Sequence, residues 1–251
     1  MKALEKYTRK RFKNLDKLLA VFPQKNEKES FHKIRLEIKK IKAILGLIRF
    51  HDKQFRAHKH YIPFRTLFRV TGKLREAGLQ QELMEQYTRI HTPFYRSPSS
   101  DIGKFKKAIP KLIKPIRKHE KIILKQITGI KRWLYYTYVQ RRKGALLKKL
   151  MAGYVPADLH RIRKQIKEVI YLTSIEKPLS TEPLLISMAE AIGNWHDKIL
   201  LIDFLKAEAT SNSKTIHDLR TETHHDLKEI KKLTKDYIAK NRIRISRIRN
   251  S

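Results

Sequence analysis

The stretch that decides the fold reads FHKIRLEIKKIK at residues 31–42, and a second version, LHRIRKQIKEVI, follows 128 positions later at residues 159–170. In both stretches a histidine is followed by basic residues three and seven positions further on. Because positions i, i+3 and i+7 share one face of an α-helix, the basic residues form one stripe and the apolar residues another. The apolar stripe of the first stretch consists of Phe31, Ile34, Ile38, Ile41 and Leu45. A helix of this kind presents a fixed row of positive charge, so its repetition predicts a duplicated anion-binding site.

The composition agrees with an anionic partner. Lys and Arg number 58 against 24 Asp and Glu, which gives a formal charge of +34 on 251 residues. Self-repulsion of this size opposes the compact state, and a polyanion relieves it. The chain is nevertheless built to fold, because 41% of its residues are hydrophobic. Its eight glycines, nine prolines and long runs of helix-forming residues favour an all-α protein.

Periodicity and helix-breaking residues predict eight helices, four before and four after Gly129. The expected ranges are about 2–22, 29–50, 63–90 with a break at Gly78, 104–126 with kinks or breaks at Pro110 and Pro115, 130–151, 159–174, 181–209 and 214 onward. The clearest loop of the first half is expected at residues 91–103, which contain two prolines and three serines. An equal number of helices on each side of the midpoint is what a tandem duplication predicts.

A second pair of segments supports the duplication. Gly72-Lys73-Leu74-Arg75-Glu76 follows the first stretch, and Gly193-Asn194-Trp195-His196-Asp197 follows the second. A glycine inside a helix costs about 1 kcal/mol relative to alanine, so it usually has a packing reason. We expect close approach of another helix there, with Glu76 and Asp197 placed to pair with a basic residue of the stripe.

The order and spacing of these motifs resemble those of the conserved-histidine α-helical domain (CHAD) family, and the resemblance covers essentially the whole chain. His32-Lys33-Ile34-Arg35 is similar to the first signature of the family, and residues 159–164 with Lys167 and Tyr171 to the second. The resemblance implies one domain, residues 1–251, made of two four-helix bundles related by a pseudo-twofold axis, at residues 1–127 and 128–251. It also implies a basic central groove or pore and binding of inorganic polyphosphate. The second signature departs from the family at Glu168 and Ile170, where basic residues are expected, so the second stripe is predicted to be the weaker one.

The candidate ligand-binding residues come from both stripes and from a looser third version near the C-terminus. They are His32, Lys33, Arg35, Lys39, Lys40, Lys42, Lys73, His160, Arg161, Arg163, Lys164, Lys167, His217, Arg220, His224 and Lys228. Glu168 is expected to repel an anion unless it pairs with Lys164 or Arg161. The alternating basic residues 242–249 form either the end of the last helix or a basic arm.

Catalytic chemistry is not expected. The chain contains no cysteine, no phosphate-binding glycine loop, no Ser/His/Asp arrangement and no grouped carboxylates for Mg²⁺. We therefore predict a binding protein with no catalytic residues, no cofactor and no metal site, whose partner is inorganic polyphosphate or another polyanion. Nucleic acid is the main alternative partner, because the same positive charge would attract it. The aromatic residues Trp133, Tyr135, Tyr136 and Tyr138, followed by Arg141-Arg142-Lys143, could stack bases, but core packing by some of these rings and an interfacial position for the rest is the preferred interpretation. With no signal peptide and no membrane-spanning run, the expected location is the cytoplasm, in association with polyphosphate granules if these are present.

Overall fold

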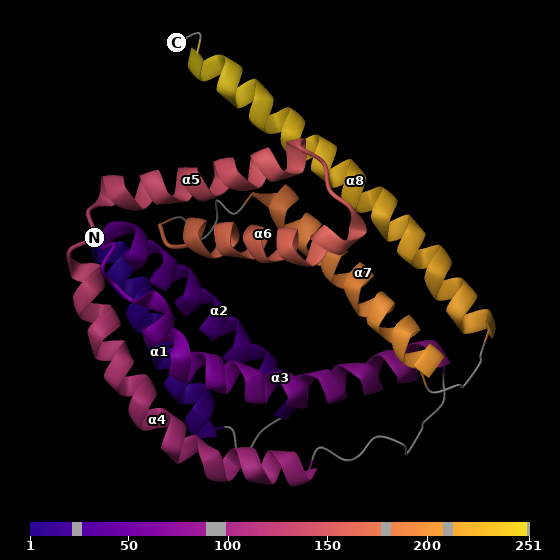
Figure 1. Ribbon diagram of the computed structural model, residues 1–251, viewed down its shortest axis with the longest axis horizontal. Helices are drawn as coiled ribbons and strands as arrows, with labels where there is room; N and C mark the ends of the chain where they lie inside the picture. The colour runs from indigo at the N-terminus through magenta and orange to yellow at the C-terminus, as the bar shows by residue number, and fades with distance from the viewer. Residues whose placement is uncertain (22–26, 89–98, 177–181, 208–212, 250–251) are drawn as a thin grey trace. The chain divides into compact units, whose positions relative to one another are not determined.

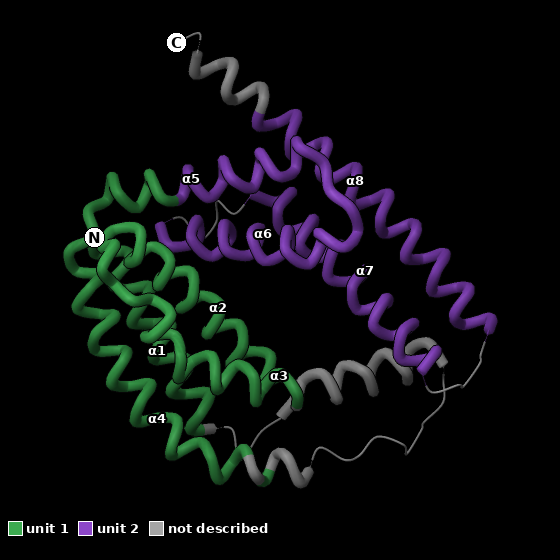
Figure 2. The backbone as a smooth tube through the Cα atoms, in the orientation of Figure 1, with its two compact units in different colours: residues 1–138 green, residues 139–251 purple. Residues whose placement is uncertain are grey.

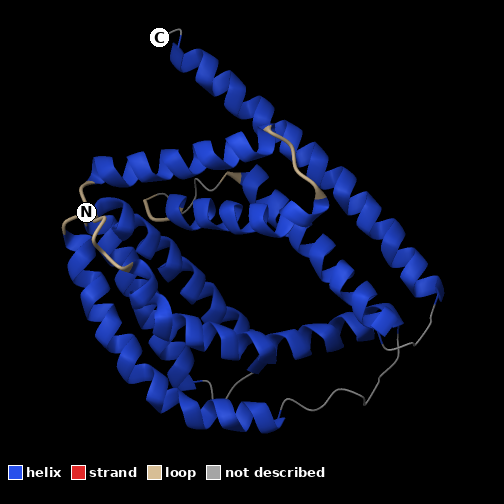
Figure 3. Cartoon of the chain, viewed as in Figure 1, coloured by secondary structure: helices blue, strands red, loops and turns tan. Residues whose placement is uncertain are grey.

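The computed structural model describes residues 1–21, 27–88, 99–176, 182–207 and 213–249. Within these ranges, the description leaves out the side chains of residues 21, 27, 28, 74–88, 99–102, 104 and 242–249. Two features of the sequence analysis therefore lie outside the described residues, namely residues 91–98 of the predicted loop and the side chain of Glu76. The described residues form helices and no strand, which confirms the all-α fold class (Figure 3). In chain order the helices are α1 (Lys2–Val21), α2 (Glu27–His51), α3 (Ala57–Thr88), α4 (Ser99–Thr128), α5 (Arg132–Met151), the short 3₁₀ helix η1 (Pro156–Asp158), α6 (Leu159–Thr173), α7 (Pro183–Ala207) and α8 (Ser213–Arg249) (Figure 1).

The chain divides into two compact units, Met1–Tyr138 and Val139–Ser251 (Figure 2). Unit 1 contains α1 to α4 and the first residues of α5. Unit 2 contains the rest of α5, then η1, α6, α7 and α8. The basic stretch at residues 31–42 lies on α2 of unit 1, and the stretch at residues 159–170 lies on α6 of unit 2. Each unit therefore holds one version of the stripe.

In unit 1, α2 packs against α1 on one side and α3 on the other, and α4 covers α1 and α3. All five residues of the predicted apolar stripe of α2 are buried, which confirms the face assigned to them. Aromatic rings join the helices of this core: Phe31 of α2 lies 5.8 Å from Phe105 of α4, and Phe12 of α1 lies 6.0 Å from Phe64 of α3, measured between ring centroids.

In unit 2, α7 packs against both α6 and α8. Its core unites residues of α5, α6, α7 and α8 that are at least nine-tenths buried; they include Leu146, Leu150, Ile162, Ile166, Val169, Met188, Ile192, Trp195, Ile230 and Tyr237. The turn after α5 passes through Gly153, whose φ of 82° lies in the left-handed region that glycine adopts without strain. This turn ends α5 where the sequence predicts.

Two helices differ from their predicted extents. α3 begins at Ala57, six residues before Pro63, and it continues through Gly78 without the expected break. α4 is one continuous helix through Pro110 and Pro115, and its ribbon bends along its length (Figure 1). A proline removes one backbone hydrogen bond, and a helix that is packed on its neighbours can absorb this loss by bending.

Candidate anion-binding site

The basic stripe of α2 lies along the seam between α2 and α3, where it meets aromatic rings of α3. The Arg35 guanidinium carbon is 3.8 Å from the centroid of the Phe68 ring, and Lys39 Nζ is 5.9 Å from the same centroid. Lys42 Nζ is 5.4 Å from the centroid of the Tyr61 ring. The negative face of an aromatic ring attracts a cation at these distances. Three cations predicted to bind the ligand are thus brought into one row.

The guanidinium of Arg35 is held in place by α3. Its Nη1 donates a hydrogen bond of 2.5 Å to the backbone carbonyl oxygen of Phe68. A Cβ atom added to Gly72 would lie 2.5 Å from the same Nη1, so the guanidinium occupies the space that the missing side chain leaves. Another helix does approach closely at this glycine, and the group of α2 that needs the space is a side chain of the basic stripe.

Unit 2 repeats this arrangement. Arg163 of α6 donates from Nε to the carbonyl oxygen of Ala189 at 3.0 Å. A Cβ atom added to Gly193 would lie 2.5 Å from Arg163 Nη2 and 3.0 Å from its Cζ. In both units the accepting carbonyl belongs to the residue four positions before the glycine. The two motifs noted in the sequence are thus the two parts of one local structure, which is present in each unit.

Lys40 belongs to a different contact. The buried carboxylate of Glu37 lies between Arg11 of α1 and Lys40, with N–O distances of 3.1 Å and 2.9 Å. Burial lowers the pKa of Lys40, and the hydrogen bond to Glu37 opposes this effect. Lys40 therefore takes part in the contact between α1 and α2, and it does not join the row of Arg35, Lys39 and Lys42 on the α3 side. Its part in ligand binding stays a prediction.

The other candidates of unit 1 are exposed. Lys33 forms an ion pair of 2.6 Å with Glu29, and both side chains are more than half exposed, so solvent weakens this pair. His32 at the start of the stripe and Lys73 next to Gly72 are also exposed. These residues are accessible to a ligand that reaches the seam.

In unit 2 the residues at the seam between α6 and α7 are His160, Arg163 and Lys167. The His160 ring lies 5.1 Å from the ring of His196, which is three positions after Gly193. Burial lowers the pKa of Lys167, Arg163 lowers it further, and Glu190 of α7 opposes both effects. Lys164 is exposed, whereas Arg161 is bound to Asp158 at 2.5 Å, at the start of α6.

The two departures of the second stripe have packing reasons. Glu168 forms an ion pair with Arg142 of α5, a partner that the sequence analysis did not name. Ile170 is partly buried against the core of unit 2. Glu168 and Ile170 therefore connect α6 to the rest of its own unit. The sequence alone could not identify this partner of Glu168, because Arg142 belongs to another helix.

The third version of the motif lies on the exposed side of α8. His217, Arg220, His224 and Lys228 are all exposed. Leu219, Ile230 and Tyr237 of the same helix face the core. Because an α-helix turns by about 100° per residue, the four basic side chains lie on the opposite side of α8 from these three residues. Their part in ligand binding stays a prediction.

The structure adds cations that the sequence analysis missed. Arg65 and Arg69 are exposed on α3, where they precede Lys73 at intervals of four residues. Burial raises the pKa of Tyr61, and the charges of Arg35 and Arg65 oppose this rise, so both guanidinium groups act on the Tyr61 hydroxyl. The repeat of positions 65, 69 and 73 could have been found by extending the glycine motif towards the N-terminus.

The counterparts of these cations on α7 are not basic. The two units can be aligned on Gly72 and Gly193. In this alignment Arg65 corresponds to Ile186, Arg69 to Glu190 and Lys73 to Asn194. The seam in unit 1 is therefore cationic on both helices, whereas the seam in unit 2 is cationic on α6 alone.

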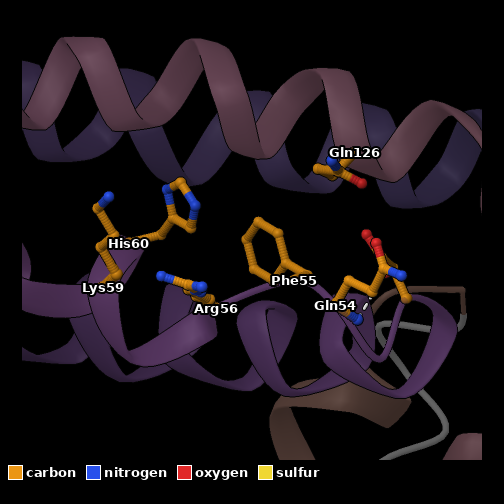
Figure 4. Close-up of a pocket in the computed structure, with 7 residues that line it drawn as sticks. Gln54, Phe55, Arg56, Lys59, His60 and Gln126 are labelled. Atoms are coloured by element: carbon orange, nitrogen blue, oxygen red, sulfur yellow. Dashed lines mark hydrogen bonds between the residues drawn. The ribbon is translucent and has the colours of Figure 1, made fainter.

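An open pocket of about 340 Å³ lies elsewhere in unit 1, beside His60 (Figure 4). It is lined by Asp52, Gln54, Phe55, Arg56, Lys59, His60 and Gln126. The His60 ring stacks on Phe55 with centroids 4.6 Å apart, and its Nδ1 lies 3.0 Å from Nδ1 of His119 on α4. One ring must donate and the other accept, so the two Nδ1 atoms share one proton.

We expect unit 1 to lose stability as the pH falls below the ordinary histidine pKa of about 6.5. Burial lowers the pKa of both His60 and His119, and Lys59 adds to the effect on each. Both imidazoles thus resist protonation in the folded state, while the unfolded chain takes up protons at its higher pKa, so the stability present above that pKa is lost below it. Urea denaturation at about pH 8 and about pH 5.5 measures this. His119→Gln should reduce the pH dependence, and His58→Gln, which removes an exposed histidine of α3, should leave it unchanged; the opposite ranking would contradict this account.

Among the described residues, no group of three or more His, Cys, Asp or Glu side chains is arranged to hold a metal ion. None of the helices that these residues form combines the length and apolar character needed to cross a bilayer. No protein-family model, curated protein or solved structure matches the chain.

Proposed function

We propose that this chain is a CHAD-like domain that binds inorganic polyphosphate without transforming it. The observation that carries the proposal is the α2–α3 seam of unit 1, where Arg35, Lys39 and Lys42 lie over aromatic rings of a helix that contributes Arg65, Arg69 and Lys73. No Asp or Glu occurs between Ala57 and Lys73. A face on which cations are not balanced by acids is suited to a polyanion, whereas an ordinary solvated face carries both signs.

The spacing of the cations suits a chain-like ligand. Residues four apart on a helix are about 6 Å apart along its axis, so the two rows offer positive charge at regular intervals. A polyphosphate chain carries about one negative charge on each phosphate, and guanidinium groups can bind phosphate oxygens in pairs. Binding of this kind releases counterions, so we expect it to weaken steeply as salt is added.

The repeated arginine–glycine arrangement supports the duplicated architecture. Arg35 with Gly72 and Arg163 with Gly193 make the same local contact in two units that share no residue. We propose that the units are the two halves of a duplicated domain and that each half contributes one basic seam to ligand binding.

Binding without catalysis is proposed because of the chemistry of the seam. Enzymes that transfer phosphoryl groups hold Mg²⁺ with carboxylates beside the reacting phosphate. The acids nearest to this part of the stripe have other partners: Glu37 binds Arg11 and Lys40, and Glu29 binds Lys33. Incubation with long-chain polyphosphate and Mg²⁺, followed by gel analysis of chain length, should show no shortening.

Nucleic acid is the second candidate ligand, and one observation favours it. Trp133 and Tyr136 of α5 are 63% and 40% exposed. The guanidinium carbon of Arg132 is 5.5 Å from the centroid of the Tyr136 ring. Exposed aromatic rings beside a guanidinium can stack bases. Tyr135 and Tyr138, in contrast, are buried and belong to the core.

Competition between the two ligands tests the proposed function. The protein is titrated with labelled polyphosphate and then with unlabelled single-stranded RNA, and the experiment is repeated with the labels exchanged. We expect polyphosphate to displace RNA far more effectively than RNA displaces polyphosphate, and Trp133→Ala to leave polyphosphate affinity unchanged. If RNA is the stronger competitor and Trp133→Ala abolishes its binding, the chain is a nucleic-acid-binding protein.

The two seams are expected to contribute unequally, and Glu190 offers a test. This exposed acid lies close to Lys167 at the position where unit 1 has Arg69. Glu190→Gln should tighten polyphosphate binding about two- to fivefold, because one nearby like charge is removed at the surface. Glu168→Gln is the matched control: it removes the partner of Arg142, so it should lower stability and leave affinity unchanged. Titrations at several salt concentrations with melting curves would measure both, and tighter binding from Glu168→Gln alone would contradict the assignment.

A further inference from the structure

Each unit contains an arginine whose guanidinium fits into the space above a helix glycine. In unit 1 the guanidinium of Arg35 has three neighbours on α3: the carbonyl oxygen of Phe68 accepts from its Nη1, the Phe68 ring lies beneath it, and Gly72 provides the space for it. In unit 2 the Arg163 guanidinium donates to Ala189 and lies over Gly193.

We propose that Gly72 and Gly193 are positioning residues that fix these guanidinium groups for binding phosphate groups. This inference rests on the proposed function and adds to it a reason why the arginines and glycines occur together. A guanidinium held by a carbonyl and, in unit 1, by a ring face has already lost most of its rotational freedom. When two oxygens of a phosphate group bind this guanidinium, little additional conformational entropy is lost, because its N–H donors are already held in position.

The contacts of Gly72 and Gly193 indicate that these glycines position the guanidinium groups and are not needed for the helix itself. A Cβ atom at position 72 would be 2.5 Å from Arg35 Nη1, but the next nearest atoms are also at the end of the Arg35 side chain. The same is true of position 193, where all three nearest atoms belong to the Arg163 guanidinium. Alanine therefore displaces the end of a flexible side chain and leaves the helix backbone in place. Because alanine also favours the helix, the folded state should not be weakened.

The test compares glycine-to-alanine variants at three positions. Gly72→Ala and Gly193→Ala place a methyl group against a guanidinium, whereas Gly144→Ala on α5 places the same group where no other atom lies within 4 Å. Melting temperature and affinity for long-chain polyphosphate are measured for each variant. We expect Gly72→Ala to bind about tenfold more weakly, with a melting temperature equal to or above that of the unsubstituted protein. Gly193→Ala should show a smaller loss, and Gly144→Ala none.

A second arm shows whether the glycine acts through the arginine. Arg35→Lys keeps the charge but loses the planar arrangement of donors, so it should bind about as weakly as Gly72→Ala. In the Arg35→Lys background, Gly72→Ala should cause no additional loss of affinity. Affinity that is unchanged in Gly72→Ala would overturn the inference while the proposed function stands. If melting temperature and affinity fall together, the arginine–glycine contact stabilises the fold and does not position the guanidinium for the ligand. If the unsubstituted protein does not bind polyphosphate, both this inference and the proposed function are wrong.

Discussion

Replacing Arg35 and Lys39 together by alanine is expected to weaken polyphosphate binding on the order of 100-fold. Each charge-assisted contact contributes about 1.5 kcal/mol, and about 1.4 kcal/mol corresponds to a factor of ten in affinity. Both side chains lie over the Phe68 ring in the row that we propose contacts the ligand. Titration of labelled polyphosphate into the folded variant measures the loss, and its salt dependence should become shallower because fewer counterions are released.

The matched control is the pair Lys121→Ala and Lys125→Ala. These two lysines are also four residues apart in unit 1, and both are exposed on the side of α4 opposite Ile116, Ile123 and Ile127. The change in net charge is the same, so only the position differs. Substitutions between residues 142 and 149 are less suitable, because Arg142, Lys143 and Lys149 hold ion pairs with acids of unit 2. Equal losses from the α2 and α4 pairs would show that total charge, and not the row, determines affinity.

Glu37→Ala is expected to destabilise the fold by on the order of 3 kcal/mol, because it leaves a buried cation without its partner. Arg11 is 8% exposed and Glu37 6% exposed, and Glu37 also holds Lys40. Urea denaturation gives the free energy of unfolding.

Glu29→Ala on the same helix is the control for this prediction. Glu29 pairs with Lys33 at the surface, where an ion pair contributes about 0–1 kcal/mol. Its removal should shift the midpoint of unfolding only slightly. Equal effects of the two substitutions would mean that the Glu37 network does not hold α1 and α2 together.

Periodicity alone was sufficient to predict the parts of the site that lie on one helix. The apolar residues of α2 recur at helical intervals, so their burial follows. Arg35, Lys39 and Lys42 are spaced by four and three residues, so they share another face. The pairing of Arg35 with Gly72 and of Arg163 with Gly193 could be anticipated as a repeated pattern, but not as a contact. A mid-helix glycine signals that something occupies the space above it, and it does not say whether that is backbone or a side chain.

Contacts between helices are what the sequence could not provide. Lys39 and Lys40 are adjacent and point about 100° apart, and the i,i+3 spacing on α2 already places Lys40 beside Glu37. The packing of the helices decides that Glu37 also binds Arg11 of α1 and that Lys39 meets Phe68 of α3. Glu168 likewise finds Arg142, 26 residues away on α5, and this partner cannot be distinguished in the sequence from nearer cations on α6. The extra cations Arg65 and Arg69 became significant only when α3 was placed beside α2.

Lysine footprinting in the presence and absence of polyphosphate tests the central claim most directly. The folded protein is treated with an amine-reactive reagent, and the modification of each lysine is measured by mass spectrometry with and without bound polyphosphate. We predict that Lys39, Lys42 and Lys73 are strongly protected by the ligand, whereas Lys121 and Lys125 stay as reactive as they are in its absence. Equal protection of all five lysines, or protection of the α4 pair alone, would contradict the assignment of the α2–α3 seam as the polyphosphate site.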